Sequence, residues 1–213
     1  ITDRAMRFRL SFTLPIPLSY LVLTGILLTG LGCGSSESGP ESGSELQASA
    51  ETPPDSIRTA VEQAVTEVNQ MRESRAATIG EEKIDRQTFA RVCMPVGKRA
   101  KEIAAEQGWV FQQLSDKYRN PAHELDAQSR PIYEEFSSSP QMRDTWMRTE
   151  REGTQGWRYY RRITVQSSCM GCHGAREERP EFVKESYPQD RAYGFEPGDL
   201  RGVYSVFVPA SGH

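Results

Sequence analysis

Three neighbouring residues in the C-terminal part of the chain have types and spacing that could hold an iron porphyrin. Cys169 and Cys172 are separated by two residues, and His173 follows at once, which is the haem c attachment signature. Two thiols at this spacing can add to the two vinyl groups of one porphyrin, and the adjacent imidazole then becomes an axial ligand of the iron. The motif predicts one covalently attached haem c per chain, with His173 as a metal ligand.

The same two thiols have other possible uses. In an oxidising compartment they could form a Cys169–Cys172 disulfide or a non-haem thiol redox pair. A thioredoxin-like pair would open a helix after a strand, whereas Gly174 and a charged run over 175–180 follow here. Zinc would need another ligand, and Cys93 and His123 are single residues without zinc-site spacing. Haem attachment is the favoured interpretation. A disulfide or thiol redox pair, and a zinc site, stay open as alternatives.

The residue on the other face of the iron is not chosen by spacing. The candidates are Cys93, His123 and methionines such as Met94 and Met170. Met170 lies inside the attachment loop and is badly placed to reach across the ring. Cys93 stands on the apolar stripe of a predicted helix, where a small buried side chain is the plainer interpretation.

The elements that must position these residues are predicted from hydrophobic spacing. Helical periodicity indicates a helix over 57–76 and a second one through Cys93, where Pro95 removes a backbone hydrogen bond and predicts a kink or a restart. A further helix is expected within 124–136, and strands are expected over 109–114, 145–150, 157–166 and 202–209. Helices followed by hairpin strands indicate an α+β fold, with helices on one side of a small antiparallel sheet.

The N-terminal part of the chain reads as an export segment. Residues 1–33 carry Arg7 and Arg9 before an uncharged, Leu-rich stretch, which is typical of a bacterial lipoprotein signal in which Cys33 would carry lipid. Gly30 and Leu31 depart from the usual order of that motif. The alternatives are an uncleaved N-terminal anchor, since 10–31 is long enough to span a bilayer, and plain secretion. All three place the domain outside the cytoplasm, and a lipoprotein would lie on the periplasmic face of a membrane.

The net charge of −3 is unevenly distributed between the N-terminal segments and the domain. Residues 34–56 carry five acidic side chains and no basic one, and their Ser, Gly, Glu and Pro content predicts a disordered acidic linker. The remaining domain, 57–213, sums to zero. A neutral domain gives no electrostatic case for nucleic acid, and a mean hydropathy of −0.61 excludes a polytopic membrane protein.

Several sequence blocks together resemble the family of c-type haem domains with a PAS-like fold and Cys/His axial ligation. The attachment motif alone is shared by many cytochromes, so the combination carries the resemblance. Beside 169–174, the blocks are the helical 90–93, Tyr-Arg-Asn-Pro at 118–121, Trp-Arg-Tyr-Tyr at 157–160, 187–195 and Gly-Asp-Leu-Arg-Gly at 198–202.

The resemblance implies a PAS-like fold over about 57–209, with haem bound covalently by Cys169 and Cys172 and ligated axially by His173 and Cys93. His123 stands where the family often has Asn, so it is kept as a second candidate for the sixth ligand. Candidate partners of the haem propionates are Arg119 and a set on one predicted strand, although a solvated charge is the plainer interpretation of each. That set is Arg158, Arg161 and Arg162.

Three function classes follow from a haem in this setting. A thiolate ligand favours ferric iron, so a His/Cys haem should have a low potential and suit an electron carrier. Release of Cys93 on reduction would open a coordination position and suit a redox or gas sensor. A peroxidase-type enzyme is the alternative, and only His123 is free to be its distal acid-base residue. The prediction is an exported, membrane-tethered haem redox protein with an unidentified redox or signalling partner.

Overall fold

The computed structural model describes residues 52–80 and 84–210. The predicted export segment and nearly all of the predicted linker lie outside these residues. The first element within the described residues is the long helix α2 (Asp55–Ala76), which buries Val61, Val65 and Val68 at helical spacing. The helix predicted over 57–76 is therefore confirmed, and it begins two residues earlier.

The second predicted helix is divided at Cys93 into α3 (Arg86–Val92) and α4 (Met94–Gln107). The carboxylate of Asp85 begins α3 by accepting a hydrogen bond from the backbone N–H of Thr88 at 2.8 Å, which satisfies a free donor of the first turn. Pro95 falls in the first turn of α4, where its missing N–H has no partner to lose. The restart predicted beside Cys93 is confirmed.

Four strands form one antiparallel sheet in the order β1-β4-β3-β2. Their bounds are Val110–Leu114, Asp144–Arg151, Thr154–Thr164 and Leu200–Pro209, numbered along the chain. The β2–β3 hairpin turns at Glu152 and Gly153, whose φ angles are 52° and 79°. Two positive φ angles suit the right-handed twist of a tight hairpin.

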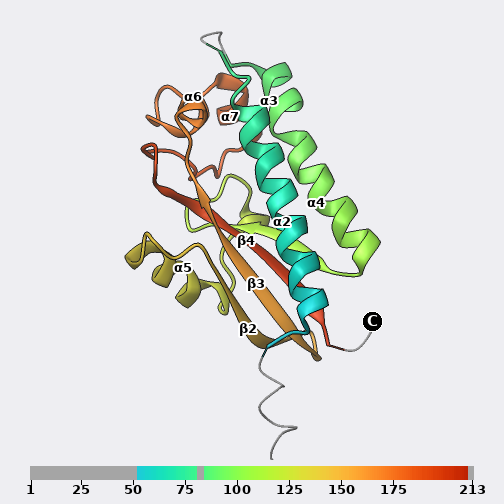
Figure 1. Cartoon of the computed structure of the whole chain (residues 1–213). Coiled ribbons are helices and arrows are strands. Elements are labelled where there is room, and N and C mark those ends of the chain that lie inside the picture. Colours follow the sequence, from blue (N-terminus) through green and yellow to red (C-terminus); the bar gives the residue numbers. More distant parts are fainter. Residues whose placement is uncertain (1–51, 81–83, 211–213) are drawn as a thin grey trace, which may run out of the picture. The chain divides into compact units, whose positions relative to one another are not determined.

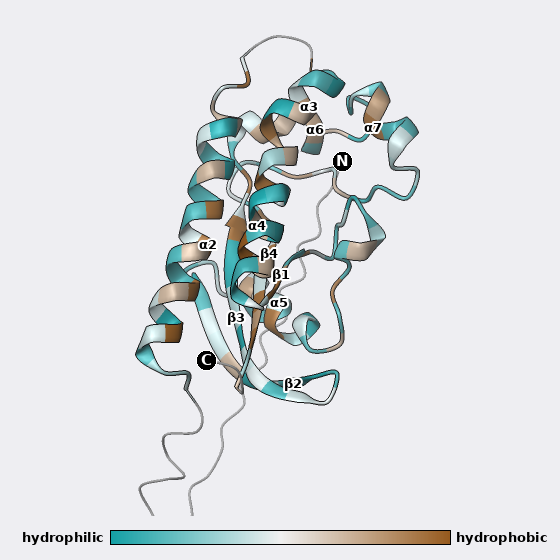
Figure 2. Ribbon diagram, turned by 90° about the vertical axis from the view of Figure 1, so that its right-hand side faces the viewer, coloured by the Kyte–Doolittle hydropathy of each residue, from teal (hydrophilic) through white to brown (hydrophobic). Residues whose placement is uncertain are grey.

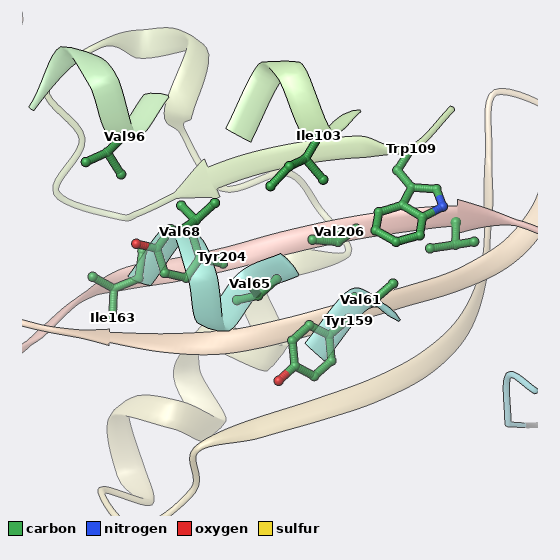
Figure 3. Packing of buried hydrophobic residues seen from close by; sticks show 11 residues of the cluster. Val61, Val65, Val68, Val96, Ile103, Trp109, Tyr159, Ile163, Tyr204 and Val206 are labelled. Atoms are coloured by element: carbon green, nitrogen blue, oxygen red, sulfur yellow. The ribbon is translucent and has the colours of Figure 1, made fainter. Parts of the chain in front are cut away.

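Helices cover both faces of this sheet within the described residues. Helices α2 and α4 lie side by side on one face, and α5 (Ser129–Ser138) lies on the other (Figure 1). Val61, Val65 and Val68 of α2 point toward Tyr204 and Val206 of the sheet (Figure 3). Phe136 of α5 packs with Leu114, Tyr160 and Val203 on the opposite face. The α+β prediction, with long N-terminal helices on a small antiparallel sheet, is confirmed. The expectation that the helices lie on one side of the sheet is wrong, because α5 buries Phe136 against the opposite face.

The connection from β3 to β4 contains three short helices and no strand. They are η2 (Ser167–Cys169), α6 (Met170–His173) and α7 (Glu181–Ser186). Figure 2 shows α3, α6 and α7 grouped at one end of the sheet, as Figure 1 does. This arrangement places the restart at Cys93 beside the attachment motif. No helix in residues 52–80 or 84–210 is long and apolar enough to cross a membrane.

Candidate functional site

The attachment motif forms a compact turn with both thiols free. Cys169 closes η2 and caps α6, and Cys172 lies within α6. Both side chains are half-buried, and neither forms a disulfide. A Cβ on Gly171 would lie 2.4 Å from the side chain of Ile84, so the residue between the cysteines packs directly against the start of the α3 region. The motif is thus held as one turn, with two thiols available for covalent attachment.

His173 is held in one tautomer by its neighbour across the site. Its Nδ1 lies 2.7 Å from the carbonyl oxygen of Ala192, which can only accept, so Nδ1 donates and Nε2 keeps its lone pair. Burial, then the charges of Arg201 and Arg119, hold the pKa of His173 well below its usual range. The side chain is therefore a neutral imidazole with one nitrogen free to ligate a metal, oriented by a carbonyl as bound histidines usually are.

Cys93 is brought to the attachment cysteines by the junction of α3 and α4. Solvent reaches its side chain, yet burial by the surrounding protein, followed by the charge of Cys172, raises the pKa of Cys93 to about 11. Cys169 also acts on it, while Arg119 and Arg201 oppose the rise. The structure therefore brings together four residues that the sequence proposed for one site, namely Cys93, Cys169, Cys172 and His173.

Aromatic packing fixes where α3 places Cys93. The ring of Phe89 lies 5.8 Å from that of Phe182 on α7 and 6.3 Å from that of Tyr187, measured between centroids. The guanidinium of Arg86 donates to the hydroxyl of Ser186 at 3.2 Å and lies over Phe182. These contacts tie α3 to the segment that follows the attachment motif. Sequence spacing indicated none of them.

Arg119 reaches the site but is engaged by the protein. Its Nη2 donates to the carbonyl oxygen of Cys172 at 2.9 Å, and its Nε lies 3.4 Å from Asp190. Asp190, whose side chain is 0% exposed, also pairs with Arg179 at 2.7 Å and accepts from the backbone N–H of Ala192. Arg119 therefore holds the end of α6, and its pairing with a propionate stays a prediction.

A second arginine of the site, Arg201 at the start of β4, was not singled out from the sequence. It is 9% exposed, and its Nη1 donates to the hydroxyl of Ser115 at 3.2 Å and to the carbonyl oxygen of Lys117 at 3.0 Å. Its guanidinium carbon lies 5.4 Å from the centroid of Phe195, and this ring meets the ring of His173 edge-on at 6.0 Å. The signal that could have found Arg201 is its place in the Gly-Asp-Leu-Arg-Gly block.

The other candidates for the second iron ligand are His123, Met94 and Met170. His123 ends the short helix η1 (Pro121–His123) and is exposed, and burial followed by the charges of Arg201 and Lys101 lowers its pKa. Met94 is 58% exposed. Met170 packs into the small cluster around Phe195. The charge of Arg201 acts on both His123 and Cys93, and His123 stays a second candidate.

The arginines on β3 serve the sheet rather than the attachment motif. Arg158 is 4% exposed and pairs with Asp126 at 2.6 Å. Arg161 donates to the hydroxyl of Thr66 on α2, and Arg162 donates to three backbone carbonyl oxygens, those of Phe136, Ser139 and Met142. The interpretation of these residues as solvated charges is wrong, because their hydrogen-bond partners are brought to them by distant elements.

A cavity of about 710 Å³ flanks the attachment turn on another side. Its lining includes Ile84, Ser168, Gly171 and Arg179, but none of the four candidate thiol and imidazole groups. In residues 52–80 and 84–210, no group of three or more His, Cys, Asp or Glu side chains is arranged to hold a metal ion.

Gly97 leaves open space beside Cys93 on α4. Gly97 lies one turn further along α4, on the same side as Cys93, and a Cβ built there would have nothing within 4 Å. Glycine in a helix interior is less stable than alanine by about 1 kcal/mol, and no neighbour in the described residues accounts for it. Two free thiols, a neutral imidazole and open space along α4 fit a porphyrin attached by the motif.

Comparison with protein families matches residues 52–209 to the Tll0287-like family. Among solved structures, the chain is similar to the cyanobacterial heme-protein Tll0287, at 41% sequence identity and a TM-score of 0.64. The similarity covers 75% of this chain and 98% of that one. A search of curated proteins found no match.

Proposed function

The chain belongs to the Tll0287-like family, and from this premise we propose that it is an exported c-type haem protein with a one-electron redox role. The observation that carries the proposal is the free Nε2 of His173 beside two free thiols at attachment spacing. The relative described as a heme-protein supports it, because the similarity extends over nearly all of that chain.

The residues of the site have distinct roles in this proposal. Cys169 and Cys172 would hold the haem covalently, and His173 would bind its iron through Nε2. Cys93 would be the second protein ligand, supplied from the α3–α4 junction. The bound haem supplies an iron centre that changes its charge by one electron. The protein keeps the imidazole neutral and oriented through Ala192, and it keeps the attachment turn in place through Arg119.

Two redox roles are compatible with these ligands, and one observation favours sensing as the second candidate. An electron carrier needs a rigid, fully ligated iron, which the contacts of Asp190 and Phe89 support. A sensor needs a ligand whose movement changes the structure, and Cys93 is the single residue between α3 and α4. Loss of a bond between Cys93 and the iron would therefore act directly on the junction of these two helices.

The membrane attachment is part of the proposal. Haem c is attached outside the cytoplasm, which fits the export segment over 1–33 and the acidic linker over 34–56. Lipid on Cys33 would hold the domain on the periplasmic face of a membrane, as would an uncleaved anchor. Cys33→Ala should move a lipid-tethered protein from the membrane fraction into the soluble fraction, whereas an anchored protein would stay in the membrane.

Mass spectrometry of the denatured protein tests covalent attachment. The full chain is expressed together with a cytochrome c maturation system, and a Cys169→Ala/Cys172→Ala variant is the matched control. We expect the wild-type mass to exceed that of the bare polypeptide by one haem and the variant to show no addition. A wild-type protein without the added haem, under conditions that mature another c-type cytochrome, would refute the proposed function.

A further inference from the structure

Arg201 is a buried cation for which the described protein provides no counter-charge. The residue is nine-tenths buried, and no ion pair joins it to any carboxylate among residues 52–80 and 84–210. Burial, followed by the charge of Arg119, lowers the pKa of Arg201 to about 10, so the side chain stays charged at neutral pH. An unpaired buried charge is strongly unfavourable, and so a site that retains one should have an anionic partner.

The carboxylate of Asp190, the candidate for that partner, already interacts with other groups. Asp190 acts on Arg201 at a distance, but its two oxygens are used by Arg119, Arg179 and the backbone N–H of Ala192. The buried part of the site thus holds three guanidinium groups and one carboxylate. Its surplus of two positive charges equals the charge of two ionised carboxylic acids.

The guanidinium of Arg201 still has donors to offer. Both hydrogen bonds that it donates to the described residues leave from Nη1. Its Nε and Nη2 donate to none of the described residues. Neither atom is fully buried without a partner, so both keep contact with solvent. Two adjacent N–H groups of one guanidinium match the two oxygens of a carboxylate. Lys117 offers less, because its Nζ donates to Gly194 and lies over the ring of Phe195.

We propose that Arg201 is the residue that binds the propionate carboxylates at the edge of the haem. The inference rests on the proposed function, and it assigns a partner to the cofactor's anionic edge that differs from the Arg119 expected from the sequence. Phe195 links the two ends of this arrangement, because its ring contacts both the guanidinium of Arg201 and the imidazole of His173. A cofactor ligated by His173 therefore lies one aromatic ring away from the buried cation.

The test uses the haem-loaded full chain and three variants. Arg201→Met removes the charge at similar length, and Arg201→Lys keeps a charge but cannot donate from two adjacent N–H groups. Arg161→Met is the matched control, because Arg161 also lies on a central strand but donates to Thr66 under α2. Resonance Raman spectroscopy reads the propionate bending bands, and a redox titration reads the midpoint potential.

We expect Arg201→Met to shift the propionate bands and to move the potential in the negative direction, because a buried positive charge that disfavours ferric iron is lost. Arg201→Lys should give smaller shifts of the same sign, and Arg161→Met should give none. Unchanged bands and potential in an Arg201→Met protein that carries haem would overturn the inference, as would equal shifts in Arg161→Met.

If Arg201→Met does not fold, Arg201→Lys decides, since shifted bands support the inference and unchanged bands reject it. Failure of the proposed function looks different. In that case the wild-type protein itself carries no covalent haem, whereas failure of this inference alone leaves a loaded protein whose propionate bands ignore Arg201.

Discussion

Two clusters of arginine and aspartate in this fold differ in charge balance. Under α5, Arg158 donates to Asp126, and its other donors are taken by Ser205 and Gln128. At the attachment end, Asp190 serves Arg119 and Arg179, while Arg201 has only neutral acceptors. The first cluster is neutral, and its carboxylate is 40% exposed. The second is cationic.

This difference in charge balance distinguishes a structural ion pair from a binding site. A neutral, hydrogen-bonded cluster needs nothing further, and Arg158 serves to join β3, β4 and the turn before α5. A buried surplus of positive charge is unfavourable for the protein alone, and an anionic ligand would remove it. The comparison therefore points to the attachment end as the place where a charged cofactor completes the structure.

The largest effect is expected from removing the charge of Asp190. Asp190→Asn keeps the size and the acceptor for Ala192 but leaves Arg119 and Arg179 without their carboxylate. Breaking a buried ion pair typically costs about 3–5 kcal/mol, and we expect a loss of this size in urea unfolding of the haem-loaded protein. Asp116→Asn is the control, because its pair with Arg130 is about half exposed. A loss below about 1 kcal/mol would show that Asp190 does not hold the site together.

A smaller loss is expected at the neutral cluster. Asp126→Asn removes a charged hydrogen bond to Arg158, worth about 2 kcal/mol, while Ser205 and Gln128 continue to accept from the guanidinium. Chemical unfolding measures the loss, and the visible spectrum of the haem should not change. A changed spectrum would mean that the two clusters are coupled and that the comparison fails.

Phe89→Ala should separate ligand positioning from general stability. The ring is half-buried between α3 and α7, and its loss should cost about 2 kcal/mol and loosen the position of Cys93. Phe111→Ala is matched, because Phe111 is also half-buried but packs on Tyr204 under α2. We expect similar losses in unfolding free energy and a changed ferric spectrum for Phe89→Ala alone. Equal spectra would remove Phe89 from the site.

The change in stability caused by Gly97→Ala should differ in sign between the proteins with and without haem. Alanine in a helix interior is favoured by about 0.5–1 kcal/mol over glycine, so the Cys169→Ala/Cys172→Ala protein should gain stability. The loaded protein should gain nothing or lose stability, because the proposed cofactor would occupy the space beside α4. Thermal unfolding of the four proteins measures both effects. An equal gain with and without haem would place the cofactor elsewhere.

The smallest effect is the acid dependence of the neutral cluster. Burial raises the pKa of Asp126, but hydrogen bonds from Arg158 and Ser129 outweigh this and lower it below its usual 3.8. A lowered carboxyl pKa contributes stability that is present above 3.8 and disappears as the pH falls through the folded value. The difference in unfolding free energy between wild type and Asp126→Asn should therefore narrow in acid, starting below about 3.8. A difference that stays constant down to acid unfolding would contradict the assignment.

Local patterns predicted much of the fold and the core of the site. The spacing of Val61, Val65 and Val68 is a local property and predicted α2, and the attachment motif predicted the turn that η2 and α6 form. The hydrogen-bond partner of each arginine could not be predicted, because that partner lies far away in the sequence. Arg119 and Asp190 are 71 residues apart, and Arg201 and Ser115 are 86 apart. Nothing near Arg158 or Arg201 in the sequence distinguishes the paired cation from the unpaired one.

The ferric spectrum of the loaded protein, read by EPR and optical absorption, tests the central claim most directly. The claim is that His173 and Cys93 hold one haem between them at the attachment end. Wild type should give a low-spin ferric spectrum with thiolate character, Cys93→Ala should lose that character, and His123→Ala should keep it. An unchanged spectrum in Cys93→Ala, or its loss in His123→Ala, would contradict the assignment.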